Sequence, residues 1–306
     1  MKTVIIIAGP TAVGKTRIAI EVAKHFQTEI ISADSRQCYK ELRIGVARPS
    51  REELSQIKHH FIASHSIFDE VTAAGFEQYA LTIVGELFRS HSVVVMTGGS
   101  GLYIKAFAEG LDAIPGISSE IRNQIIYNYE QHGIDWLQQQ LKEIDPLFVS
   151  IGEMKNPQRM MRALEVKLGT GSSIVEYRKN EKARREFNII KIGLELPREM
   201  LKTRIDHRVD LMIEEGLIDE VQTLLPFRKQ NALQTVGYKE VFDYLDGIAS
   251  LPDAVERIKI NTRQYAKRQM TWFKRDADMQ WKSPGDISGI ISSLHHTLRQ
   301  TDNLNP

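Results

Sequence analysis

Residues 9–16 read Gly9-Pro10-Thr11-Ala12-Val13-Gly14-Lys15-Thr16, which is a complete G-x-x-x-x-G-K-T phosphate-binding motif. An apolar run at residues 4–8 precedes the motif, and a helical pattern at residues 17–25 follows it. This is the strand, loop and helix context in which the motif binds phosphate, because the loop N–H groups and the helix N-terminus converge on one point. The stretch therefore predicts a polyphosphate site, in which Lys15 adds a full positive charge and the Thr16 hydroxyl can hold Mg²⁺.

Alternating strand and helix patterns surround this loop. Apolar runs predict strands, and amphipathic patterns predict the helices between them. The strands are expected at residues 2–8, 29–33 and 92–96, and the helices at 15–26, 76–89 and 102–108. This alternation predicts an α/β fold with a parallel sheet flanked by helices, similar to that of phosphate-loop NTPases.

The pattern changes at about residue 115. Only helices are predicted between there and a strand at residues 187–194, at 118–131, 133–143 and 156–169. We therefore expect an all-helical insertion domain at residues 116–186, within a catalytic core formed by residues 1–115 and 187–306. Further helices of the core are predicted at 197–215, 217–225 and 251–275, and a peripheral helix with a frayed end after Ser283.

The composition of the 306-residue chain limits the classes of protein it can belong to. A net charge of +1 gives no overall attraction to nucleic acid, so any such site needs local clusters of basic residues. Cys38 is the sole cysteine, which excludes an internal disulfide and a multi-cysteine zinc site. No apolar run approaches the ~20 residues of a membrane span. We expect a cytoplasmic protein that does not bind membranes, and a monomer, because no heptad repeat or exposed apolar stripe is evident.

Asp34 follows the predicted strand at residues 29–33, at the strand end where ligands bind in open α/β sheets. We expect it to face the ligand of the phosphate loop and to remove a proton from an incoming nucleophile. The alternative is a purely structural role, in which Asp34 only caps a turn with Ser35. The strand at 92–96 ends in Thr97-Gly98-Gly99-Ser100, without the acidic residue that holds Mg²⁺ in most phosphate-loop NTPases. Its glycines would let a substrate approach the backbone, and Ser100 offers a small hydrogen-bond donor.

These residues indicate a transferase and leave two chemistries open. In one, a phosphoryl group moves from ATP, as in small-molecule kinases. In the other, a carbon–oxygen bond breaks and diphosphate itself leaves, with its developing charge stabilised by the loop N–H groups, Lys15 and Mg²⁺. A phosphate-loop module that binds RNA without catalysis is a third possibility.

Further stretches resemble the tRNA dimethylallyltransferase (isopentenyltransferase) family. In chain order they are Ile31–Tyr39, Ile44–Pro49, His59-His60, Gly98–Tyr103, Asn156–Arg159, Arg162–Glu165, Val236–Tyr238 and Ala266–Gln269. With the phosphate loop they extend over about residues 5–275. Ser100 stands where the family more often has Thr, and Arg48 where Lys is common. The chain has no cysteines for the C-terminal zinc finger of many eukaryotic members, so it is similar to the bacterial type.

The resemblance implies transfer of the dimethylallyl group from dimethylallyl diphosphate to N6 of the adenine 3′ of the anticodon, position 37 of certain tRNAs. Residues 9–16 would hold the diphosphate, with Mg²⁺ at Thr16 and Lys15 stabilising it as it leaves. Asp34 would accept the N6 hydrogen bond and then the proton. Ser100 would contact the diphosphate or the adenine, and Arg208 would be a further diphosphate clamp.

The adenine is stacked in the anticodon loop and has to be extruded before it can react. A larger set of residues is implied to contact the anticodon stem-loop, some of them in the helical insertion. They are Asp34, Ser35, Arg36, Gln37, Ser100, Arg122, Gln158, Arg159, Met160, Met161, Arg162, Gln234, Thr235, Val236, Gly237, Tyr238, Lys239, Lys267 and Arg268. Prenyl transfer to free adenine nucleotides is a related alternative; the insertion and the basic segments near residues 234–239 and 267–275 favour tRNA.

Overall fold

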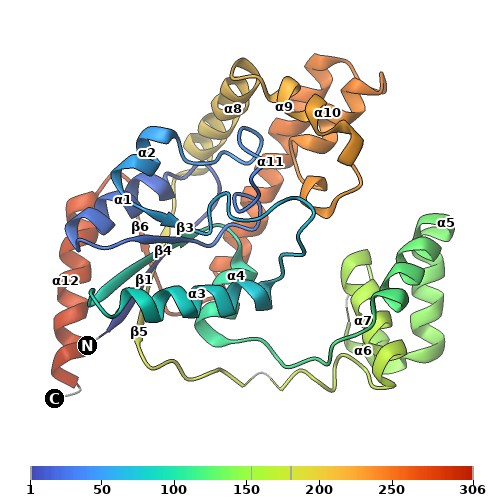
Figure 1. The fold of residues 1–306 in the computed structure, drawn as a ribbon, viewed down its shortest axis with the longest axis horizontal. Helices are drawn as coiled ribbons and strands as arrows, with labels where there is room; N and C mark the ends of the chain where they lie inside the picture. Colours follow the sequence, from blue (N-terminus) through green and yellow to red (C-terminus); the bar gives the residue numbers. More distant parts are fainter. Residues whose placement is uncertain (1, 153, 180, 305–306) are drawn as a thin grey trace. The chain divides into compact units, whose positions relative to one another are not determined.

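The computed structural model describes residues 2–152, 154–179 and 181–304. The chain divides into two compact units, one formed by Met1–Glu109 with Arg184–Pro306 and the other by Gly110–Ala183 (Figure 1). These borders lie a few residues before the boundaries expected at 115/116 and 186/187.

The first unit contains a parallel sheet of six strands within the described residues, in the order β3-β2-β4-β1-β5-β6. The strands are β1 Thr3–Ala8, β2 Ile30–Ser32, β3 His59–His60, β4 Val93–Gly98, β5 Asn188–Leu194 and β6 Met279–Lys282. Ile5 of β1 pairs with Val95 on one side and with Ile190 on the other. The chain therefore leaves the sheet after β4 and returns beside β1 once the second unit is complete. The predicted α/β fold with a parallel sheet flanked by helices is confirmed.

Successive side chains of β1 enter two different cores, because a strand presents alternate residues to opposite faces of a sheet. Val4 and Ile6 pack with helices α3 (Ala73–Leu87) and α4 (Gly101–Glu109). Ile5 and Ile7 pack with α1 (Lys15–His25) and α12 (Ile287–Leu304). Helices thus cover both faces of the sheet (Figure 1).

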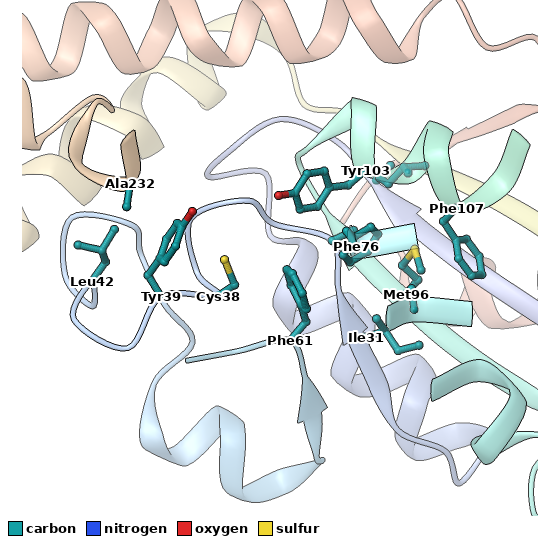
Figure 2. Packing of buried hydrophobic residues seen from close by; sticks show 14 of the residues in the cluster. Ile31, Cys38, Tyr39, Leu42, Phe61, Phe76, Met96, Tyr103, Phe107 and Ala232 are labelled. Atoms are coloured by element: carbon teal, nitrogen blue, oxygen red, sulfur yellow. The ribbon is translucent and has the colours of Figure 1, made fainter. Parts of the chain in front are cut away.

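Several aromatic side chains pack together in the core on the α3 and α4 side (Figure 2). Phe76 and Tyr103 stack with their ring centroids 4.6 Å apart, and Phe61 meets Phe76 edge-on at 5.0 Å. Cys38 is fully buried in the same cluster. Burial, with a smaller contribution from Asp34, raises the pKa of its thiol to about 12, so Cys38 is a packing residue rather than a nucleophile.

The structure adds short elements that hydrophobic periodicity did not predict. They are β3, β6, α2 (Arg51–Gln56), α6 (Pro146–Ile151) and α10 (Tyr238–Leu245). Each is too short to show a hydrophobic period. Two of them have local sequence signals instead, in the residues that cap the helix. Ser50 and Glu53 form a capping box at the start of α2, and Asp145 caps α6, which has a proline in its first turn.

The remaining helices of the first unit follow the predicted positions closely. They are α8 (Arg198–Glu214), α9 (Leu217–Thr223) and α11 (Leu251–Phe273), with short 3-10 turns at Leu225–Phe227 and Asn231–Leu233. Among the residues that the structure covers, no helix has the length and apolar character needed to cross a membrane.

The second unit is helical throughout its regular structure and has a core of its own. Its helices are α5 (Ser119–Ile144), α6 and α7 (Pro157–Thr170). Gly133 interrupts α5 with φ 72° and ψ −163°, which matches the break expected between residues 131 and 133. Leu137, Phe148 and Met160 are buried together in the unit's core.

Candidate active site

A cavity of about 1120 Å³ lies at the carboxyl ends of β2 and β4, beside the phosphate loop. All of its lining residues belong to the first unit. The predicted site residues on its wall are Thr11, Ala12, Gly14, Lys15, Thr16, Asp34, Arg36, Gln37, Arg208, Thr235, Val236 and Gly237. The structure therefore brings the predicted diphosphate-binding loop, the predicted base and part of the predicted tRNA-contact set to one space.

The phosphate loop connects β1 to α1 through three residues with positive φ, the first of which is Gly9 at 152°. Gly14 has φ 104°, and Ala12 has φ 63°, which is a strained conformation for a residue with a Cβ. Lys15 Nζ donates to the Pro10 carbonyl oxygen at 2.8 Å, so the lysine folds back over its own loop. Burial lowers the pKa of Lys15 to about 8; Asp34 opposes this change, and Arg208 adds to it.

Helix α8 brings two guanidinium groups to the loop. Arg208 Nη1 donates to the Thr11 hydroxyl at 3.3 Å, and Arg204 Nη1 donates to the Val13 carbonyl oxygen at 3.2 Å. Both side chains line the cavity. Burial lowers the pKa of Arg208 from its ordinary value, with Glu53 opposing and Arg204 reinforcing the change. Arg204 was not among the predicted residues, although its i, i+4 spacing to Arg208 on one helix face is a signal for it.

Asp34 uses one carboxylate oxygen to fix its own turn. Its Oδ1 accepts the backbone N–H groups of Arg36 at 2.9 Å and Gln37 at 3.2 Å. The alternative that Asp34 caps a turn is therefore correct for this oxygen. Within the described part of the chain, Oδ2 has no hydrogen-bond partner, so the second oxygen is available for chemistry in the cavity.

Ser100 holds the same turn from the opposite side. Its Oγ accepts the Ser35 N–H at 2.9 Å and donates to Ser35 Oγ at 3.2 Å. Ser100 thus contacts the residue next to Asp34, and it is absent from the lining of the cavity.

The glycines at and after the end of β4 make close contacts with protein, which the sequence-based expectation of substrate contact did not include. A Cβ on Gly98 would lie 2.1 Å from the Ala33 carbonyl oxygen, and a Cβ on Gly99 would lie 2.2 Å from Gln269 Nε2. Gly101 is in similar contact with the Trp272 ring. These glycines let β2 and α11 approach the loop closely.

Glu220 of α9 organises the far wall of the cavity. Its carboxylate accepts the N–H groups of Ile44 at 2.8 Å and Gly45 at 3.1 Å, and the Tyr238 hydroxyl at 2.6 Å. Tyr238 is 0% exposed, so the prediction that its side chain contacts tRNA is wrong, and the ring supports the wall instead. No motif pointed to Glu220, because its role arises only from the folded positions of three distant segments.

A second, smaller pocket of about 370 Å³ shares Arg36, Thr235, Val236 and Tyr265 with the first. The predicted tRNA-contact residues that line it are Ser35, Arg36, Gln234, Thr235, Val236, Lys239 and Arg268. Lys267 is exposed on α11 beside them.

The other predicted tRNA contacts lie on the second unit. Arg122, Gln158 and Arg159 are exposed there. Arg162 forms an ion pair of 2.9 Å with the buried Glu165. Met161 is half-buried, whereas Met160 is 0% exposed in the unit's core, so a contact of the Met160 side chain with RNA is excluded in this conformation.

Comparison with known proteins places the chain in a family. The model of the family described as IPP transferase matches residues 37–276. This chain belongs to the IPP transferase family. The tRNA dimethylallyltransferase of Christiangramia forsetii is 50% identical over 275 residues, which cover 90% of this chain and 91% of the relative. That of Flavobacterium psychrophilum is 47% identical over 306 residues, covering 98% of this chain and all of the relative.

Solved structures of the family have the same fold. The full-length tRNA isopentenylpyrophosphate transferase of Bacillus halodurans is 33% identical, with a TM-score of 0.73 over 99% of both chains. A eukaryotic dimethylallyltransferase described as acting on tRNA is 26% identical, with a TM-score of 0.81 over 99% of this chain and 80% of the other.

Proposed function

We propose that this chain transfers the dimethylallyl group to tRNA with the phosphate loop and Asp34 acting from two sides of one cavity. The reaction is that of the family: dimethylallyl diphosphate alkylates N6 of the adenine 3′ of the anticodon, at position 37, and diphosphate is released. One observation carries the assignment of roles, namely that Lys15, Arg208 and Asp34 line the same cavity, with Arg208 bonded to the phosphate loop at Thr11. A volume of about 1120 Å³ exceeds that of most single-ligand pockets and suits a prenyl diphosphate together with an extruded base.

The loop side of the cavity is suited to a leaving diphosphate. The carbon–oxygen bond of the donor breaks, and both electrons remain on the diphosphate oxygen. Lys15 and Arg208 place positive charge beside that group, and the N–H groups at the start of α1 add partial positive charge. Bound phosphate would also restore the proton affinity of Lys15, which burial has lowered.

The acceptor side is suited to a weak nucleophile. The lone pair of an adenine amino group is delocalised into the ring, so N6 needs a base as the new carbon–nitrogen bond forms. Asp34 Oδ2 accepts that proton, while Oδ1 stays bonded to Arg36 and Gln37 and keeps the carboxylate oriented. No side chain of the protein is oxidised or reduced in this reaction.

Magnesium dependence is part of the proposal. No group of three or more His, Cys, Asp or Glu side chains that could hold a metal is found in the described residues. Mg²⁺ binds with only one or two protein ligands when phosphate oxygens and water complete its shell, so the Thr16 hydroxyl on the cavity wall fits this ion. When bound, Mg²⁺ would neutralise charge on the diphosphate.

The smaller pocket is proposed to receive anticodon-loop nucleotides that flank the extruded adenine. Arg36, Lys239 and Arg268 give it positive charge, and Tyr265 gives it an aromatic ring. Contacts of the second unit with the stem-loop, a monomeric state and a cytoplasmic location remain predictions from the sequence.

The direct test is a product analysis. The protein is incubated with dimethylallyl diphosphate, Mg²⁺ and an unmodified anticodon hairpin, and the nucleosides are identified by mass. We expect prenylated adenosine from the hairpin and none from a matched hairpin with guanine at position 37. Equal prenylation of free AMP would favour the nucleotide alternative, and phosphate transfer from ATP without prenylation would favour a kinase.

A further inference from the structure

Gln269 connects the two sides of the cavity. It lies on α11, far in sequence from both loops, and its side chain is 6% exposed. Its Oε1 accepts the Thr11 N–H at 2.8 Å, and its Nε2 donates to the Gly99 carbonyl oxygen at 2.9 Å. One buried amide therefore bridges the phosphate loop and the loop after β4, with both of its polar ends used.

The Thr11 end of this bridge fixes the phosphate loop. Thr11 is followed by Ala12, the residue with the strained φ of 63°, and its hydroxyl receives the hydrogen bond from Arg208. With its N–H bound to Gln269, Thr11 presents its side chain toward Arg208 and withholds its own N–H from the anion. The position of the Arg208 clamp thus depends on the orientation of Thr11.

The Gly99 end fixes the turn that carries the proposed base. Gly99 precedes Ser100, which binds both the N–H and the hydroxyl of Ser35. Ser35 follows Asp34 directly, so a shift of the Gly99 backbone is passed to the Asp34 turn. The fit is tight, because a Cβ on Gly99 would lie 2.2 Å from Gln269 Nε2.

We propose that Gln269 is a positioning residue that sets the separation between the leaving-group cradle and the catalytic base. The inference rests on the proposed roles of the phosphate loop and Asp34. Gln269 also lines the cavity, and the proposed role is carried by its two hydrogen bonds to protein backbone. It acts through Thr11 on diphosphate binding and through Gly99 on the base, and misplacement of reacting groups by about 1 Å can lower a rate by about 100-fold.

The test compares Gln269→Leu, which retains side-chain bulk and loses both hydrogen bonds, with the wild-type protein. We expect kcat to fall about 10- to 100-fold and KM for dimethylallyl diphosphate to rise several-fold, while KM for the hairpin changes least. Gly99→Ala pushes Gln269 out of place from the other side, so it should produce the same combination of effects.

Leu294→Ala is the matched control, because Leu294 is 0% exposed on α12 in the core shared with α1. It should lower thermal stability at least as much as Gln269→Leu and leave kcat and KM per folded molecule unchanged. The proposal would be overturned if folded Gln269→Leu had the kinetics of the wild-type protein. It would also be overturned if Leu294→Ala lost as much activity as Gln269→Leu. Failure of Lys15→Ala to weaken diphosphate binding would instead refute the assignment of the phosphate loop.

Discussion

Replacement of Lys15 by methionine is expected to stabilise the free protein while it abolishes diphosphate binding. Burial lowers the pKa of Lys15 from 10.5 to about 8. Since each pKa unit corresponds to about 1.4 kcal/mol, keeping the buried lysine charged at pH 7 costs at most about 3 kcal/mol. Loss of the hydrogen bond to Pro10 offsets about 1 kcal/mol of the gain. The net expectation is about 2 kcal/mol, or a rise in melting temperature of about 4 °C.

The pH dependence of stability identifies the cause. Below pH 8 the lysine is protonated in both the folded and the unfolded chain, so the penalty is fully present. Between about pH 8 and 10.5 the unfolded chain binds the extra proton, and wild-type stability should therefore rise with pH relative to that of Lys15→Met. Melting temperatures measured by calorimetry should converge over this range, and the wild type should become the more stable protein near its upper end.

Lys191→Met is the matched control, because Lys191 is also buried but is paired with Asp276 at 2.7 Å. Its replacement removes the partner of the half-buried Asp276 carboxylate, which is 26% exposed, and should lower stability. If Lys15→Met melts at or below the wild-type temperature and the two pH profiles run parallel, the reasoning about the buried charge is wrong. Calorimetric titration with inorganic diphosphate checks the loss of binding.

Three further outcomes are expected. Asp34→Asn should lower kcat by about 10²- to 10⁴-fold with diphosphate affinity retained; single-turnover kinetics and titration calorimetry check this, and a variant with full activity would remove Asp34 as the base. Glu220→Gln places an amide among backbone N–H donors and the Tyr238 hydroxyl, so chemical denaturation should show a loss of about 1–3 kcal/mol; unchanged stability would contradict the role of this carboxylate. Because the pKa of the buried Cys38 thiol is raised to about 12, iodoacetamide at pH 8 should modify it only after unfolding, and rapid labelling of the native protein, followed by mass spectrometry, would contradict its burial.

Motifs whose function depends on consecutive residues could be predicted from the sequence. The phosphate loop could be recognised over residues 9–16, because its glycines, Lys15 and the start of the following helix lie within a few residues of each other. Strands such as β1 were predictable because they are continuously apolar, and the absence of an acidic residue after β4 excluded the usual hydrolytic arrangement. Asp34 was predictable from its place after a strand, since parallel strands bring their carboxyl ends to one edge.

The roles of residues that act through partners distant in the sequence could not be predicted from it. Gln269 and Glu220 carry no local signature, and the backbone groups that they bind, at Gly99 and Gly45, lie 170 and 175 residues away. Arg204 has only its spacing to Arg208 as a signal, and its partner Val13 lies 191 residues away. For the same reason Tyr238 and Met160 were misassigned as RNA contacts, since a motif shows that a residue matters without showing whether its side chain is buried.

Residue patterns alone predicted the parallel sheet, the helical insertion and the phosphate site, because strand and helix periods and loop motifs act over short distances. The choice of prenyl transfer over phosphoryl transfer came from the resemblance to a family and not from these patterns. The folded structure was needed to show that one oxygen of Asp34 is bonded within its own turn, and that Gly98 and Gly99 leave room for Ala33 and Gln269. Hydrogen bonding and packing between segments remote in the chain depend on three-dimensional proximity, which no local pattern encodes.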